Sequence, residues 1–165
     1  MRPSLLIADG HRLYAEALCS MLSESYEIVG IATDGLELTE LAIRHTPDLI
    51  VTELSMPRLS GLGAMHDLKK KGLRTKFLVL TTHTEVGIAA LAFCVGASAF
   101  VLKTASSDEL TEAISAMKCG GHYLSRQFPG DLDAVLAKAA RRPLFDQGPH
   151  LSRHEREILR FVQQV

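Results

Sequence analysis

Short apolar runs alternate with longer amphipathic stretches along most of the chain. Five runs are rich in Val, Ile, Leu or Phe, namely 4–8, 27–32, 48–52, 77–81 and 99–102. Most of them do not alternate apolar with polar positions, which is typical of strands buried on both faces of a parallel sheet. The pattern therefore predicts five parallel strands.

The stretches between these runs have the length and periodicity of helices. They cover residues 11–23, 35–45, 62–71, 84–95 and 106–119. In the first of them, one helical face holds Leu13, Ala17, Leu18, Met21 and Leu22. Five consecutive strand–helix units predict an α/β fold, a doubly wound five-stranded parallel sheet with right-handed crossovers.

The pattern changes after Gly120 and Gly121. Residues 122–125 are compatible with a short extended piece, and 130–142 have the pattern of an isolated amphipathic helix. A segment containing Pro and Gly follows, and 151–165 form a helix pattern with a capping box at Ser152 and Glu155. We predict one domain over 1–124, a linker with a helix over 125–150, and the first helix of an incomplete second domain over 151–165.

Composition narrows the class of protein. The 165 residues are 47% hydrophobic, which fits a globular domain, and the net charge of −1 by itself says nothing about nucleic acid. The three cysteines are far apart and have no metal-ligand spacing, so reduced thiols are expected. The sequence has neither an apolar run of membrane-spanning length nor a signal-peptide pattern, and we expect a cytoplasmic protein without membrane contact.

Polar residues follow the predicted strands at their carboxyl ends. Asp9 and Gly10 follow the first strand, Glu53 the third, Thr81 ends the fourth, and Lys103 follows the fifth. Ligands of open parallel sheets bind at this edge. Carboxylates there can act as nucleophile or metal ligand, and a hydroxyl and an ammonium group can hold a phosphoryl group.

Five segments carry a resemblance to a known family. They are IADGHRLYAEAL (7–18), LIVTELSMPRLSG (49–61), FLVLTTHTE (77–85), GASAFVLKTAS (96–106) and LSRHEREILRFV (151–162). The first four resemble, in order, the acidic-pair segment, the phosphoacceptor strand, the switch-threonine strand and the aromatic-and-lysine strand of response regulator receivers of the NarL/FixJ type. The fifth resembles the first helix of a LuxR-type helix-turn-helix. The resemblance implies a flavodoxin-like strand order of 2-1-3-4-5.

The resemblance also assigns roles to the residues of the rim. Asp9 matches the first acid of the pair that binds Mg²⁺ in a working receiver, but the second acid is replaced by Gly10. The aspartate that accepts the phosphoryl group is replaced by Glu53. The switch residues and the lysine of the phosphate pocket are matched by Thr81, Phe100 and Lys103.

These two replacements oppose phosphorylation. Gly10 supplies no ligand to Mg²⁺, which needs tight octahedral oxygen coordination, so Mg²⁺ binding is expected to be weak or absent and no other cofactor is predicted. The extra methylene of Glu53 moves its oxygens by ~1.5 Å, and a misplacement near 1 Å can cost ~100-fold in rate. We predict that the domain is not phosphorylated in the usual Mg²⁺-dependent way and that Glu53 pairs with Lys103 instead.

Simpler interpretations of the same residues stay open at this point. Glu53 is also compatible with a solvated loop carboxylate, and Lys103 with an ordinary surface lysine. Asp9 is compatible with the N-cap of the helix that follows it.

The predicted function is transcription control rather than enzymatic catalysis. The expected partners are a second copy of the chain, a histidine kinase or other regulatory protein, and DNA through the C-terminal domain of the full-length protein. The reading helix of a helix-turn-helix follows its first helix, so this chain alone is not expected to bind specific DNA. Two alternatives remain. One is a stand-alone pseudo-receiver that binds partners through its first helix or its fourth and fifth helices, and the other is a receiver still phosphorylated on Glu53 in a rearranged site.

Overall fold

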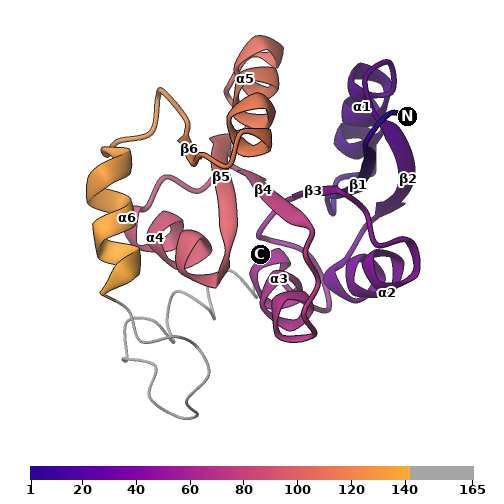
Figure 1. The fold of residues 1–165 in the computed structure, drawn as a ribbon, viewed down its shortest axis with the longest axis horizontal. Coiled ribbons are helices and arrows are strands. Elements are labelled where there is room, and N and C mark those ends of the chain that lie inside the picture. Colours follow the sequence, from indigo (N-terminus) through magenta and orange to yellow (C-terminus); the bar gives the residue numbers. More distant parts are fainter. Residues whose placement is uncertain (142–165) are drawn as a thin grey trace.

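The computed structural model describes residues 1–141 (Figure 1). The strands are β1 (Ser4–Ala8), β2 (Glu27–Ala32), β3 (Leu49–Thr52), β4 (Lys76–Thr81), β5 (Ala97–Leu102) and β6 (Tyr123–Leu124). The helices are α1 (Arg12–Leu22), α2 (Gly35–His45), α3 (Gly61–Lys70), α4 (Val86–Val95), α5 (Ser107–Lys118) and α6 (Leu132–Ala140). The predicted strand–helix alternation is confirmed, with boundaries that coincide or differ by at most two residues.

The strands form one parallel sheet in the order β2-β1-β3-β4-β5-β6. The predicted order 2-1-3-4-5 is confirmed for the first five strands, and the short extended piece expected at 122–125 joins the sheet as a sixth strand. The additional strand β6 pairs with the edge of β5, where Tyr123 lies opposite Ala99. At two residues, β6 is too short for a periodicity signal, and only its pairing with β5 defines it as a strand.

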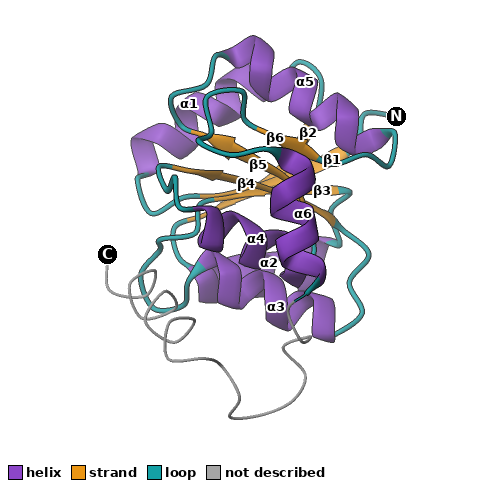
Figure 2. Cartoon of the chain, turned by 90° about the vertical axis from the view of Figure 1, so that its left-hand side faces the viewer, coloured by secondary structure: helices purple, strands orange, loops and turns teal. Residues whose placement is uncertain are grey.

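Helices cover both faces of the sheet (Figure 2). One layer contains α1 and α5, and the other contains α2, α3, α4 and α6. Each layer has its own apolar core, and successive residues of β1 alternate between them: Leu6 packs in one core, while Leu5 and Ile7 pack in the other. Both faces of β1, β3, β4 and β5 are therefore buried, which explains their continuous apolar runs.

Local sequence signals set several helix ends. The side chain of Asp34 accepts hydrogen bonds from the first-turn amides of α2, and the hydroxyls of Ser60 and Ser106 do the same for α3 and α5. After α3 the chain reverses at Gly72, whose φ of +81° is favourable for glycine. The caps at Ser60 and Ser106 end the loops that carry Glu53 and Lys103.

The helix α1 buries fewer apolar side chains than its sequence pattern predicted. The buried side chains of α1 are Ala15, Leu18 and Leu22. Leu13 is 81% exposed and Met21 is 41% exposed. Helical spacing placed these residues near the packed stripe, but only the angle at which α1 lies on the sheet decides where that stripe ends.

The predicted helix after residue 130 is not isolated. The helix α6 packs against α4, as Figure 1 shows, and buries Val135 and Ala139. Its partner α4 is apolar on nearly every side, with buried residues from Ile88 to Phe93, because it lies between the sheet and α6. The remainder of the predicted linker and the predicted helix over 151–165 lie outside the described residues. Within residues 1–141 no helix is long and apolar enough to cross a membrane.

Candidate functional site

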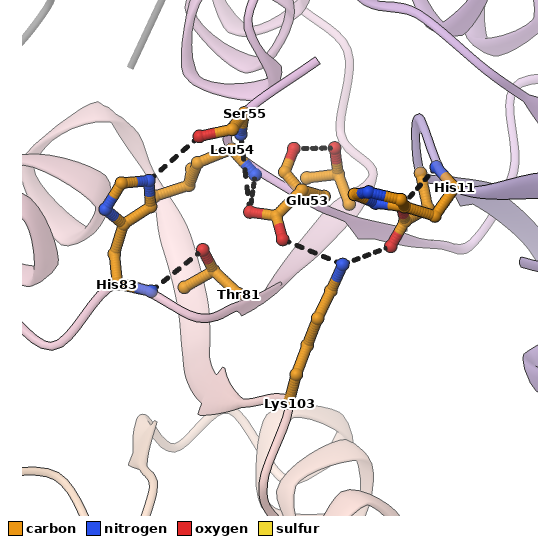
Figure 3. A network of polar contacts seen from close by, with 9 residues as sticks. His11, Glu53, Leu54, Ser55, Thr81, His83 and Lys103 are labelled. Carbon is orange, nitrogen blue, oxygen red and sulfur yellow. Dashed lines mark hydrogen bonds and ion pairs between the residues drawn. The ribbon is translucent and has the colours of Figure 1, made fainter. Parts of the chain in front are cut away.

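The predicted rim residues meet at the carboxyl edge of the sheet (Figure 3). Asp9 follows β1, Glu53 follows β3, Thr81 ends β4 and Lys103 follows β5. Parallel strands end on the same side, so residues separated by up to about 90 positions in the chain converge there. The convergence that the sequence predicted is therefore present.

Lys103 bridges two buried carboxylates. Its Nζ lies 2.6 Å from Asp9 Oδ2 and 2.9 Å from Glu53 Oε2. The side chains of Asp9 and Glu53 are at most 5% exposed and that of Lys103 is 12% exposed. Burial lowers the pKa of Lys103, but its hydrogen bonds to both carboxylates and their charges outweigh burial and raise that pKa above its ordinary value. The ion pair expected between Glu53 and Lys103 is present, and Asp9 is a second partner.

The second oxygen of each carboxylate is also bound. Glu53 Oε1 accepts hydrogen bonds from the amides of Leu54 at 2.6 Å and Ser55 at 3.3 Å. Asp9 Oδ1 accepts the amide of His11 at 2.8 Å. His11 itself is the N-cap of α1 and makes no side-chain cap. Asp9 therefore holds the turn before α1 instead of capping the helix, and Glu53 is not a solvated loop carboxylate.

Gly10, at the position of the missing acid, has no side chain to bind a metal ion and little space for one. A Cβ atom added to Gly10 would lie 3.3 Å from Cδ of Pro57 and 3.7 Å from the carbonyl oxygen of Thr33. Residues 1–141 contain no group of three or more His, Cys, Asp or Glu side chains placed to hold a metal ion. The ammonium group of Lys103 already bridges the carboxylates of Asp9 and Glu53. A Mg²⁺ ion, which binds one or two carboxylates and keeps several waters, would have to displace this ammonium group or bind beside its charge.

The two expected switch residues both point into the protein. Thr81 and Phe100 have no exposed surface. The hydroxyl of Thr81 accepts the backbone N–H of His83 at 3.3 Å. The ring of Phe100 packs edge-on against that of Phe128, from the segment between β6 and α6.

A histidine contact at the rim was missed by the sequence analysis. His83 Nε2 lies 2.8 Å from Ser55 Oγ, and its Nδ1 lies 3.4 Å from Glu85 Oε2. This contact joins the loops after β3 and β4, as Figure 3 shows. Its partners are 28 residues apart, and no spacing rule links them.

Another rim contact comes from α1. Lys103 Nζ lies 4.6 Å from the ring centroid of Tyr14, within cation–π distance. Burial raises the pKa of the Tyr14 phenol, with the Asp9 and Glu53 charges in the same direction and Lys103 opposing them. Only the docking of α1 on the sheet brings Tyr14 to this position.

Comparison with known proteins assigns the chain to a family. Residues 5–115 match the model of a family described as the response regulator receiver domain. The chain belongs to this family. Among curated receiver proteins, the transcriptional regulatory protein DegU of Brevibacillus brevis is 31% identical over 122 residues, which cover 73% of this chain and 52% of DegU. The uncharacterized transcriptional regulatory protein YvfU of Bacillus subtilis is 31% identical over 160 residues, covering 96% of this chain and 74% of YvfU.

Two solved structures of response regulators resemble this one over 72% and 68% of the chain. The signal receiver domain of the response regulator NarL from Mycobacterium tuberculosis has a TM-score of 0.68 at 29% identity, covering 72% of this chain and 98% of that domain. A DNA-binding response regulator of the LuxR family from Staphylococcus aureus has a TM-score of 0.66 at 28% identity, covering 68% of this chain and 96% of the other. The chain spans about half the length of DegU.

Proposed function

We propose that this protein is a response regulator that controls transcription and that its receiver holds a permanent ion pair in place of Mg²⁺-dependent phosphorylation. The names of its relatives support the first part, because DegU and YvfU are transcriptional regulatory proteins. DNA binding would reside in the C-terminal domain of the full-length protein. The receiver would act in the cytoplasm, with a histidine kinase or another regulatory protein as its input.

The contacts of the Glu53 carboxylate support the absence of Mg²⁺-dependent phosphorylation. One of its oxygens is paired with Lys103 and the other accepts two backbone amides. These contacts hold the carboxylate in an orientation set by Lys103 and the two amides. Attack on a phosphoryl group would remove the charge of the carboxylate and weaken its pairing with Lys103, which opposes the reaction.

Mg²⁺ binding would not favour phosphorylation at this rim either. In a working receiver Mg²⁺ neutralises the phosphoryl oxygens, but here Gly10 offers no ligand and Lys103 occupies both carboxylates. A divalent cation bridging Asp9 and Glu53 would face the ammonium charge at close range. The ion pairs of Lys103 with Asp9 and Glu53 would instead partly resemble the contacts of a phosphorylated receiver, without any phosphoryl group.

The test is exposure of the protein to acetyl phosphate and Mg²⁺, followed by intact-mass measurement. We expect no phosphorylated species. The Gly10→Asp/Glu53→Asp variant, which restores both acids of a working receiver, is the matched positive control. An Mg²⁺-dependent, hydroxylamine-labile adduct on Glu53 of the unaltered protein would overturn the proposal.

A second candidate function is a protein-interaction module, and one observation favours it. Leu13 of α1 is 81% exposed, whereas α6 covers α4, which is part of the other predicted interaction face. We propose that α1 is the contact helix, with a second copy of the chain as its first partner. Light scattering over a concentration series should show dimers that Leu13→Glu abolishes, and an unchanged dimer would rule out this surface.

A further inference from the structure

We propose that this receiver also binds a small molecule with an anionic head and an apolar body, in an open cavity at the edge of the sheet opposite Lys103. The cavity has a volume of about 870 Å³, within the range of ordinary ligand pockets. Its lining includes Leu49 and Lys76, at the starts of β3 and β4, and Met117, near the end of α5. This site goes beyond the proposed function and does not depend on the state of Glu53.

The walls of the cavity are largely apolar. They include the side chains of Tyr26, Leu49, Leu73, Ile114 and Met117. Four of these are buried members of the core beneath α1 and α5, and Leu73 is partly buried against the other core. A wall supported by both cores is pre-formed, so an apolar ligand body would gain burial without a large rearrangement.

The charge around the cavity is positive. Among the described residues that line it, the charged side chains are Arg2, Arg74, Lys76, Lys118 and a single carboxylate, Asp48. The carboxylate is already bonded, because Asp48 Oδ2 accepts the amide and the hydroxyl of Ser4 at 2.8 and 2.9 Å. These bonds lower the pKa of Asp48. The remaining excess charge favours an anion.

Arg74 is the cation best placed to receive that anion. Its side chain is exposed and makes no hydrogen bond or ion pair with any residue in 1–141. A guanidinium group can bind a carboxylate, sulfonate or phosphate through two parallel hydrogen bonds. Lys118 adds a second positive charge beside the cavity, and its Nζ lies 4.5 Å above the ring of Tyr26.

The same cations have a structural alternative. The helices α2, α3 and α5 all end at this edge, and basic side chains stabilise helix C-termini. Lys76 has this role, since its Nζ donates to the carbonyl oxygen of Met117 at 2.6 Å. Arg74 makes no such bond to a helix end, which favours a role in binding over a role in capping.

The experiment uses 1-anilinonaphthalene-8-sulfonate, a fluorescent probe with an apolar body and a sulfonate head. We expect saturable binding at one site and much weaker binding of the uncharged analogue N-phenyl-1-naphthylamine. Arg74→Glu should weaken binding of the sulfonate by about tenfold or more, because attraction becomes repulsion. Lys71→Glu makes the same change of charge at an exposed residue outside the lining and should alter binding less than about twofold.

The position of the bound probe is checked by amide chemical shifts. The largest changes should fall on residues 46–49, 72–76 and 114–118. Thermal unfolding of both variants should match the unaltered protein, which excludes a folding defect. Equal weakening by the two variants, equal affinity for the uncharged analogue, non-saturable binding, or shift changes confined to other surfaces would each overturn the proposal.

Discussion

The ring of Phe100 meets the ring of Phe128 edge-on, with centroids 5.5 Å apart and planes at 78°. Phe100 has no exposed surface and Phe128 is 5% exposed. The family resemblance assigns Phe100 to the switch position, whereas Phe128 lies beyond the predicted receiver boundary at residue 124. The inward Phe100 ring is therefore enclosed by the segment that leads into α6, and it cannot move outward without displacing Phe128.

Truncating Phe128 should release this segment. We expect Phe128→Ala to lower the free energy of unfolding by about 3 kcal/mol, because it removes a buried ring and leaves a cavity beside Phe100. Urea unfolding measures the loss, and limited proteolysis should cleave residues 129–141 faster. Leu36→Ala, at an apolar side chain of α2 that is 45% exposed, is the matched control and should leave both measurements nearly unchanged.

Removing the ammonium group at the rim should be costly. Lys103→Met would leave the carboxylates of Asp9 and Glu53, which are 2% and 4% exposed, without their shared counter-ion. We expect a loss of about 3–5 kcal/mol in the free energy of unfolding at neutral pH. Adding Glu53→Gln to this variant removes one of the two unpaired negative charges and should recover part of the lost stability. Equal stability of the single and double variants would contradict the role of Glu53 as a partner of Lys103.

Glu109 should make the stability of the fold depend on pH. This carboxylate, 6% exposed at the start of α5, accepts the hydroxyls of Ser125 at 2.8 Å and Tyr123 at 3.3 Å and the amide of Arg126 at 2.8 Å. Burial raises its pKa, but these bonds and the charge of Arg126 outweigh burial and hold the pKa of Glu109 below its ordinary value of 4.5.

A lowered pKa in the folded state stabilises the fold above the unfolded-state pKa, and this contribution is lost as the pH falls through the folded value. We therefore expect the segment around β6 to loosen below about pH 4, detected by hydrogen exchange of residues 123–128. Glu109→Gln should lose the contribution at neutral pH and flatten the acid dependence. Glu112→Gln, at an exposed ion pair with Arg126, is the control and should change stability by less than about 1 kcal/mol.

Restoring the receiver acids should restore the chemistry in steps. Glu53→Asp alone shortens the nucleophile but leaves the metal site one acid short, so we expect little labelling by acetyl phosphate. Gly10→Asp/Glu53→Asp should bind Mg²⁺ measurably by calorimetry and take up a phosphoryl group. Gly10→Asp also pushes against Pro57, whose Cδ would lie 3.3 Å from the new Cβ, so a small loss of stability is expected. Equal labelling of the single and double variants would show that residue 10 is not limiting.

Some features of the fold could be predicted because they depend on local pattern. Strands buried on both faces leave continuous apolar runs, such as 77–80, and capping residues such as Ser106 mark helix starts. The pairing of β6 with β5 and the docking of α6 on α4 could not be predicted in the same way. Both depend on pairing between segments that are distant in the sequence, and neither leaves a periodic signal of its own.

The sequence by itself determined which chemical groups reach the rim: a parallel sheet brings Asp9, Glu53, Thr81 and Lys103 to one edge, and Gly10 removes an acid from it. Only the tertiary structure decided how these groups are bonded. Lys103 divides its charge between Asp9 and Glu53 because both carboxylates are buried within reach of one flexible ammonium group. Phe128 encloses Phe100 because the chain after α5 returns along the edge of the sheet, and that path follows from packing rather than from local propensity.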